Sequence, residues 1–222
     1  GTPAGPEFQV NTYTTNYQRN PGIAVQPDGA FVVVWESHGY YGQDGSGAGI
    51  FAQHFDAAGV PQGVEFAVNA FTTQGQLSPA VTADGLGNFV VAWRTGDSFA
   101  NTPDGDGPGI AAQHFAADGT RLGDELQVNT YTTGLQQLPA VAADPAGGFV
   151  VTWQSGDTFI FSSRGQDGHQ AGIFSQRLTT TAFFPPERVR GARLALLDHP
   201  TDPTRRRLLV TSDDPAIDLG GS

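Results

Sequence analysis

Three short Asp-Gly loops carry the residue types best suited to binding a cation. Each loop begins six residues before an isoleucine, at Asp44, Asp104 and Asp167. Calcium takes six to eight oxygen ligands, and such loops supply carboxylates together with backbone carbonyls that glycine lets turn freely. We therefore predict calcium as the bound ion. The candidate ligands are Asp44, Asp97, Asp104, Asp106, Asp157 and Asp167.

The second loop is the best of the three candidates, because it contains Asp97, Asp104 and Asp106. No loop has the complete twelve-residue calcium pattern with its terminal glutamate. The third loop has His169 and Gln170 where the first has Ser46 and Gly47. The alternative is that each Asp-Gly pair only makes a tight turn.

Aromatic residues gather in the same long loops, which run over residues 37–49, 95–109 and 155–172. The repeat gives these side chains no packing role, and binding residues concentrate on loops that a rigid scaffold holds. Two interpretations stay open, a ligand surface and simple anchoring of the loops. The candidates are Tyr40, Tyr41, Phe99, Phe159 and Phe161.

Tryptophan, histidine and glutamine also recur at equivalent places. The tryptophans end apolar segments, so we expect them to pack between sheets rather than to stack on sugars. The histidine position accepts arginine in the third copy, which favours a solvent-facing strand residue over a metal site. The preceding glutamine is expected to bond to the backbone of the next strand. These sets are Trp35, Trp93 and Trp153; His54, His114 and Arg177; and Gln53, Gln113 and Gln176.

Glu36 is the one candidate for a unique catalytic group, since Arg94 and Gln154 replace it in the other copies. A hydrolase needs a nucleophile with a base, or a pair of carboxylates at suitable separation. One carboxylate is not a mechanism, and the absence of cysteine excludes thiol chemistry. We therefore expect no enzymatic activity.

All of these residues lie on a unit that the chain repeats three times. The motif Gln-Val-Asn-Thr-Tyr-Thr-Thr, or a close variant, begins at residues 9, 67 and 127, which are offsets of 58 and 60 residues. A fixed period with strand-like content indicates a repeat architecture. The copies span about residues 7–64, 65–124 and 125–178.

Each copy has four short apolar segments bounded by turn-forming residues, and no segment has a helical period. The segment 31–35 is apolar on both faces, which is typical of a sheet covered on both sides. This pattern predicts an all-β fold of β-propeller-like, four-stranded blades, with twelve strands and no helix. Stacked sheets and an open solenoid are the competing layouts.

The strand order predicts an incomplete ring. The chain begins with a fourth-type strand at residues 7–11, while the third copy lacks a fourth strand of its own. Three blades are also fewer than the usual four to eight. We therefore expect exposed strand edges that seek partners, with a second chain or further repeats closing the ring.

The repeats occupy residues 1–182, and residues 183–222 are expected to begin a separate β segment. Two strands are predicted there, at 189–197 and 205–211. The absence of Met and Lys, in a chain that opens Gly-Thr-Pro, indicates a processed or excised segment of a longer protein.

Charge narrows the range of partners. The net charge is −11, and residues 1–182 carry 16 acidic side chains against 5 arginines. An acidic field repels phosphate backbones and anionic membranes, so neither nucleic acid binding nor membrane adsorption is expected. No stretch approaches the roughly 20 apolar residues that span a bilayer, so we expect no membrane insertion.

The combined pattern resembles a repeat of very large secreted or surface proteins of bacteria, which are often adhesin-like and calcium-associated. The resemblance covers about 170 of the 222 residues. It is carried by residues 9–15, by Phe-Val-Val-x-Trp at 31–35, by 44–53 and by 56–59. It implies an extracellular or cell-surface location and supplies no catalytic residues.

The sequence thus predicts a non-enzymatic extracellular module, stabilised by calcium, that serves adhesion or display toward a protein or glycan ligand. A carbohydrate-binding propeller that uses the loop aromatics is the alternative, and a secreted hydrolase is the third possibility.

Overall fold

The structure is a computed structural model that describes residues 1–2, 5–39, 43–45, 47–96, 107–144, 148–156, 165–169 and 171–183, with the backbone of 192–199 and 202–212. The chain divides into two compact units, Gly1–Phe183 and Phe184–Ser222. No helix in the described part of the chain has the length and apolarity needed to cross a bilayer.

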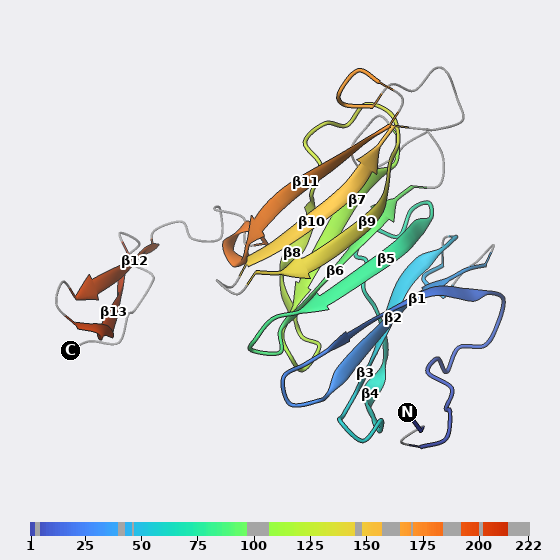
Figure 1. The fold of residues 1–222 in the computed structure, drawn as a ribbon, viewed down its shortest axis with the longest axis horizontal. Helices are drawn as coiled ribbons and strands as arrows, with labels where there is room; N and C mark the ends of the chain where they lie inside the picture. Colours follow the sequence, from blue (N-terminus) through green and yellow to red (C-terminus); the bar gives the residue numbers. More distant parts are fainter. Residues whose placement is uncertain are drawn as a thin grey trace. The chain divides into compact units, whose positions relative to one another are not determined.

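Three antiparallel sheets make up the first unit (Figure 1). Within each sheet, strands that follow one another in the chain lie side by side. The first sheet contains β1 (Gln18–Val25), β2 (Phe31–Ser37), β3 (Gly49–Phe55) and β4 (Pro61–Ala67). The second contains β5 (Gln76–Ala83), β6 (Phe89–Thr95), β7 (Gly109–Phe115) and β8 (Arg121–Gln127). The third contains β9 (Gln136–Ala143), β10 (Gly148–Ser155) and β11 (Gly172–Thr179).

Four-residue turns that end in glycine join the third and fourth strands of the first two sheets, at residues 56–59 and 116–119. In the first sheet, Asp56 Oδ1 accepts the N–H groups of Ala58 and Val60, each at 2.9 Å. Gly59 completes the turn with a φ of 81°. Glycine adopts this left-handed conformation at little cost, which explains its place in the turn.

A residue with left-handed backbone precedes a proline in the first strand of every sheet. Asn20, Ser78 and Leu138 have φ values of 52°, 54° and 53°. The pairing with the neighbouring strand shifts at each of these places. A left-handed conformation costs an ordinary L-residue about 1–2 kcal/mol, so the surrounding structure must hold these three bulges.

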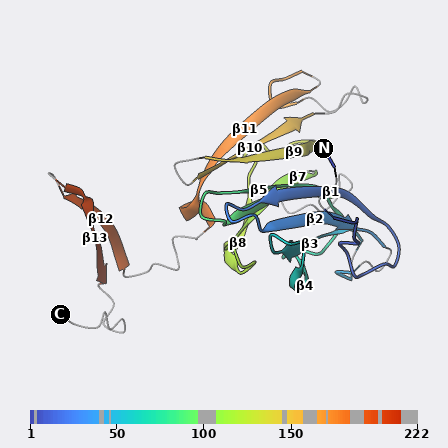
Figure 2. The same cartoon turned by 60° about the horizontal axis from the view of Figure 1, so that its bottom comes forward.

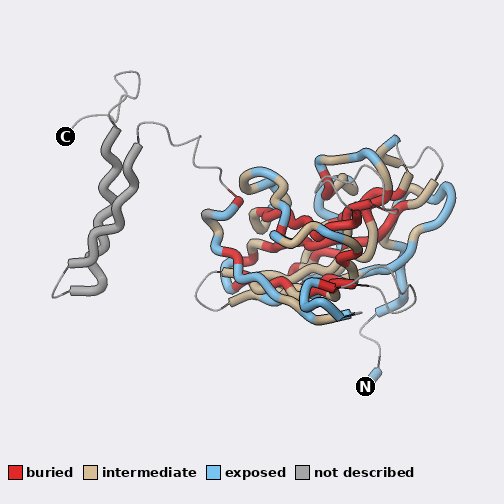
Figure 3. The backbone as a smooth tube through the Cα atoms, turned by 90° about the horizontal axis from the view of Figure 1, so that it is seen from above, coloured by how far each residue is buried: buried red, intermediate tan, exposed pale blue. Residues whose placement is uncertain are grey.

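The sheets are apolar on both faces and pack against one another. Ile50 of the first sheet shares a buried core with Trp93 of the second. Ile110 of the second sheet shares another with Trp153 of the third. The three tryptophans are at most 5% exposed. The predicted packing between sheets is confirmed for Trp93 and Trp153. Trp35 instead packs with Val33, Phe51 and Phe55 of its own sheet. Buried positions run through the middle of the unit (Figure 3).

The first strands of the sheets lie next to each other, since β1 contacts β5 and β5 contacts β9 (Figure 2). The sheets therefore fan out from their first strands. The prediction of an all-β fold with repeated antiparallel sheets is confirmed.

The described strands form no closed ring, and the third sheet has the three strands that its missing fourth segment predicts. Two other details of the prediction need correction, the strand at residues 7–11 and the absence of any helix. Residues 7–11, predicted as a strand, have no strand partner among the described residues. One short 3-10 helix, η1 (Thr180–Phe183), follows β11.

The second unit contains one antiparallel strand pair, β12 (Ala192–His199) and β13 (Asp202–Ser212). Leu196 is opposite Leu208 in this pair. The two strands overlap the two segments predicted for this region.

Candidate functional site

A buried carboxylate, Glu36, lies where the first and second sheets meet. The residue is 2% exposed. Its Oε1 accepts the side-chain N–H of Asn20 at 2.7 Å and the backbone N–H of Ser78. Its Oε2 lies 2.6 Å from His38 Nε2, and the other ring nitrogen of His38 lies 3.0 Å from an Arg19 nitrogen. We call these five residues the Glu36 cluster.

The Glu36 cluster links two of the left-handed bulges. Asn20 belongs to the first sheet and Ser78 to the second, so one carboxylate holds both. The equivalent residues Arg94 and Gln154 instead donate to the carbonyl two residues further on, each at 3.0 Å. The carboxylate bridge is therefore made only at the first junction.

The sequence reasoning singled out Glu36 but missed Arg19, Asn20 and His38. Glu36 was singled out because it differs from the equivalent residues of the other two copies. Arg19, Asn20 and His38 differ from their equivalents in the same way, so the same criterion could have found them. For example, glycine occupies both positions equivalent to His38.

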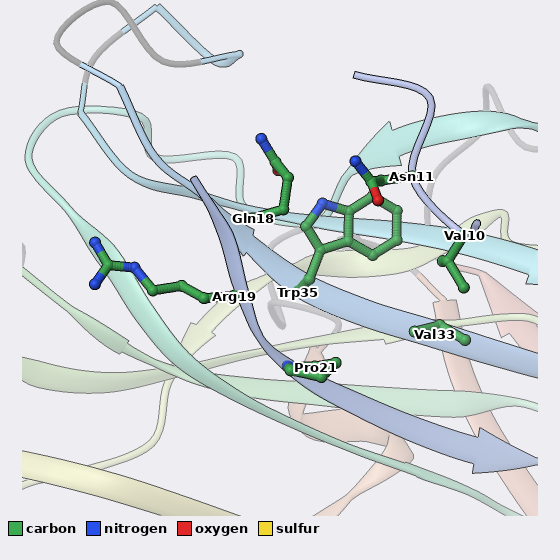
Figure 4. Close-up of a pocket in the computed structure, with 7 residues that line it drawn as sticks. All are labelled: Val10, Asn11, Gln18, Arg19, Pro21, Val33 and Trp35. Carbon is green, nitrogen blue, oxygen red and sulfur yellow. The ribbon is translucent and has the colours of Figure 1, made fainter. Parts of the chain in front are cut away.

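A pocket of about 220 Å³ opens on the face of the first sheet that no other sheet covers (Figure 4). Trp35 and Val33 supply apolar surface, while Asn11, Gln18 and Arg19 supply polar groups. The complete lining is Val10, Asn11, Gln18, Arg19, Pro21, Val33 and Trp35. We call it the Trp35 pocket.

Two buried polar atoms at the Trp35 pocket have no hydrogen-bond partner among the described residues. They are Trp35 Nε1 and Gln18 Oε1. In the second sheet, the equivalent Trp93 Nε1 donates to Gln76 Oε1 at 3.0 Å. A buried indole N–H usually has an acceptor, but Trp153 Nε1 in the third sheet also lacks one among the described residues, so the unpaired indole does not by itself mark a ligand site.

Two of the six predicted calcium ligands, Asp44 and Asp167, lie in the described part of the chain. Each carboxylate folds back over the glycine that begins the third strand of its sheet. A β-carbon added to Gly49 would lie 2.6 Å from Asp44 Oδ2, and one added to Gly172 would lie 2.7 Å from Asp167 Oδ2. Asp167 Oδ1 also accepts the N–H of His169 at 3.0 Å. Such contacts are typical of turn-forming aspartates.

The remaining predicted site residues lie outside the described residues, and their roles stay predictions. They are Asp97, Asp104, Asp106 and Asp157, with the loop aromatics Tyr40, Tyr41, Phe99, Phe159 and Phe161. Within the described ranges, no group of three or more His, Cys, Asp or Glu side chains is placed to hold a metal ion.

The prediction that the repeated histidines face solvent is wrong for His114. This residue is 3% exposed, and its ring centroid lies 5.4 Å from those of both Phe149 and Phe183. Burial lowers the pKa of His114, and the charge of Asp84 opposes this shift. The next sheet covers this position. Arg177 lies in the last of the three sheets, and no further sheet among the described residues covers it. The arginine at this position was therefore a misleading guide to the exposure of His114.

His54 is half-buried, and its Nε2 lies 2.8 Å from Gln26 Oε1. Burial lowers the pKa of His54, while Asp28 and Asp118 raise it. Gln26 also donates to the carbonyls of Gly87 and Ala117 in the second sheet, at 2.6 and 3.0 Å. The histidine thus joins a contact between sheets and not a metal site.

The sequence matches no family model and no curated protein. Among solved structures, the fold is similar to an N-acetylgalactosamine deacetylase from F. plautii in complex with blood group B trisaccharide. That match has 14% identity and a TM-score of 0.49, and it covers 78% of this chain and 54% of that one. An α-L-arabinofuranosidase from Lactobacillus brevis matches with 10% identity and a TM-score of 0.44, over 77% of this chain and 55% of that one. This chain thus spans about half the length of the two structures.

Proposed function

We propose that this chain is a non-enzymatic extracellular module of propeller-like blades, which serves adhesion or display in a bacterial surface or secreted protein. The observation that carries the proposal is the use of polar side chains to join sheets. Glu36 joins Asn20 to Ser78 across the first junction. Arg121 of the second sheet donates to the carbonyls of Ala67 and Asn69 at 3.0 and 3.4 Å.

A second joint recurs in the same form. Glu65 accepts the N–H groups of Thr12 and Tyr13 at 2.7 and 3.1 Å. Glu125 accepts those of Ala70 and Phe71 at 2.6 and 3.3 Å. Glu125 thus ties the second sheet to the segment that leaves the first, and Glu65 ties the first sheet to the equivalent N-terminal segment. A charge-assisted joint that recurs with the repeat suits a display scaffold.

A propeller layout is the arrangement that we infer for the complete module. Blades of a propeller meet along their first strands around a central axis, and β1, β5 and β9 lie next to each other here. The alternative of an open solenoid would keep the sheets stacked without converging on an axis.

Adhesion is tested by measuring binding of the purified chain to bacterial and host cell surfaces, alongside turnover of chromogenic glycosides and acetylated sugars. We expect surface binding without turnover. Sugar hydrolysis or deacetylation that is lost in Glu36→Gln but kept in the matched Gln154→Ala would contradict a non-enzymatic role.

Calcium stabilisation is the further part of this proposal, and it rests on the Asp-Gly loops. A ligand that binds only the folded state at 100 times its Kd stabilises by about 2.7 kcal/mol. Thermal unfolding in excess calcium should therefore show a Tm several degrees above that in chelator. An unchanged Tm would reduce Asp44 and its equivalents to turn formers.

Carbohydrate binding is the second candidate function, and the Trp35 pocket favours it. The pocket combines an indole surface with amide and guanidinium donors, a combination that suits sugar hydroxyls. Tyr17 is 72% exposed, and the Arg19 guanidinium lies 5.7 Å from its ring centroid. A glycan screen with the original chain and Arg19→Ala tests this role, with the equivalent change Gln137→Ala on the third sheet as the control.

A further inference from the structure

Among the described strands, β11 is the edge strand of the third sheet. β11 pairs with β10 on one side only, and it lies at the outer edge of its sheet (Figure 1). Ile173 in this strand is 75% exposed, whereas its equivalents Ile50 and Ile110 are fully buried. Gln176 is likewise exposed, although Gln53 and Gln113 are buried and donate to backbone, including the fourth-strand carbonyls of Gly63 and Gly123.

The other two sheets show which groups cover such an edge. Val68 N–H donates to the carbonyl of Ile50 at 2.8 Å, and Asn69 Oδ1 accepts the N–H of Ile50 at 2.7 Å. Ile110 has the same two bonds, at the same lengths, with Val128 and Asn129. Ile173 pairs with Gln154 as Ile50 pairs with Glu36, so its N–H and C=O point outward in the same way.

Residues 5–11 have the sequence of the missing strand. Gly5, Glu7, Phe8, Val10 and Asn11 match Gly63, Glu65, Phe66, Val68 and Asn69 at an offset of 58 residues. The match also holds against the second sheet, where Gly123, Glu125, Leu126, Val128 and Asn129 take these places.

Within one chain, residues 5–11 already pack against the first sheet. The fourth strand of the first sheet packs against the second sheet in the same way. The rings of Phe8 and Phe55 are 5.5 Å apart and tilted by 53°. The rings of Phe66 and Phe115 are 5.7 Å apart and tilted by 55°. The bonds of Thr12 and Tyr13 to Glu65 likewise match those of Ala70 and Phe71 to Glu125. The segment thus occupies the place of the last strand of a sheet that would stand before β1.

The two uncovered sheet faces also match the faces that pack inside the chain. Trp35, Phe51 and Phe55 on the first sheet take the places of Trp93, Ala111 and Phe115, which contact the sheet before them. On the third sheet, Ile173 and Ser175 take the places of Ile50 and Ala52, which contact the sheet after them. The Trp35 pocket lies on the first of these faces, so a second copy packed there would cover it and exclude a carbohydrate ligand.

We propose that two copies of this chain join head to tail, with residues 7–11 of one copy added to β11 of the other as its fourth strand. The proposal deepens the propeller-like module of the proposed function and rests on it. The occupant is a second copy because this chain carries both halves of the contact. The contact is heterologous, and two copies with three sheets each give six blades, within the four to eight of closed rings.

The repeat register specifies the bonds between copies. Val10 N–H donates to the carbonyl of Ile173, and Asn11 Oδ1 accepts the N–H of Ile173. The Glu7 carboxylate accepts the N–H groups of Thr130 and Tyr131. Phe8 lies opposite Ser175, as Phe66 lies opposite Ala52.

The experiment is sedimentation velocity of the whole chain at concentrations up to about 100 µM. We expect a dimer, and we expect Ile173→Asp to raise its Kd at least about tenfold, because the contact would bury an unpaired charge. The control is Val64→Asp, which also changes an 83% exposed strand residue to aspartate but lies outside the contact. Circular dichroism of both variants checks that they fold.

A cross-link tests the register independently, since the chain has no native cysteine. Phe8→Cys and Ser175→Cys variants, mixed under oxidising conditions, should give a disulfide-linked dimer of the two variants. Val64→Cys mixed with Ser175→Cys should not. A monomer throughout the concentration range, or equal cross-linking in both mixtures, would overturn the proposal. Neither readout depends on adhesion, so a failure of the proposed function would leave these results unaffected.

Discussion

Glu36 shows how a single buried charge is used in this molecule. Its two oxygens are occupied by Asn20, Ser78 and His38, so the carboxylate is compensated by donors from two sheets. A buried carboxylate with full hydrogen bonding fixes the surrounding backbone, and its removal leaves those donors unpaired.

Replacement of Glu36 tests this role at the residue scale. Glu36→Ala should lower the free energy of unfolding by about 2–3 kcal/mol, because it leaves the Ser78 N–H and the Asn20 amide without an acceptor. Glu36→Gln should cost less, since its amide oxygen can still accept. Urea denaturation measures both variants. If Glu36→Ala costs no more than Gln154→Ala, the bridge between the sheets contributes nothing.

His114 gives the stability a pH dependence. Burial lowers its pKa in the folded state below the ordinary value. A group with a depressed folded pKa favours folding when neutral, so this contribution is present above the unfolded pKa of about 6.5 and is lost as the pH falls below it.

The His114→Leu variant should therefore lose less stability than the original chain between pH 7.5 and pH 5. It should also be more stable at pH 7.5 by about 1 kcal/mol, because neither imidazole nitrogen has a partner among the described residues. Urea denaturation at the two pH values gives both quantities, with His169→Gln on an exposed turn as the control. A pH dependence identical to that of the original chain would show that His114 does not contribute to the pH dependence of stability.

At the scale of the element, the bulge before each proline has a conformational cost, because it holds a residue other than glycine in the left-handed backbone region. Asn20 is a residue type that tolerates a left-handed backbone better than most, whereas Leu138 has the same conformation with a branched side chain. Leu138 is also 62% exposed, so little apolar burial depends on it.

The substitution Leu138→Asn should raise the free energy of unfolding by about 0.5–1 kcal/mol, because asparagine relieves part of the left-handed cost. The matched change Leu86→Asn removes another exposed leucine, 83% exposed, from a position outside the left-handed set. It should not stabilise. Thermal and urea unfolding of the two variants decide the point, and a loss of stability in Leu138→Asn would contradict the bulge interpretation.

The strands could be predicted from sequence because Phe, Val and Trp alternate between turn residues. Trp93 and Trp153 could be placed between sheets for the same reason, whereas no described sheet precedes the one that contains Trp35. Residues 7–11 were predicted as a strand from their repeat, but a strand needs a paired neighbour, and β11 is not beside them in the described chain. The Glu36 cluster could not be foreseen as a whole, since its contacts join residues from two copies. His114 was misjudged because burial between sheets depends on position in the array.

For the whole molecule, the central claim is that the sheets are blades of a propeller that one chain begins and a second completes. The two open ends carry the repeat positions that form the internal junctions, including Ile173 at one end and Val10 and Asn11 at the other, so association can reproduce several contacts already present in the chain. The acidic surface, with a net charge of −11, opposes this association at low salt. The dimer should therefore tighten as salt rises from low to physiological concentration.

The most direct measurement is cryo-electron microscopy of the purified chain at physiological salt, at a concentration where sedimentation gives the mass of two chains. The account predicts a closed ring of six lobes around a central axis, with β11 of each copy against residues 7–11 of the other. An open particle, or a dimer joined through any other pair of faces, would contradict it.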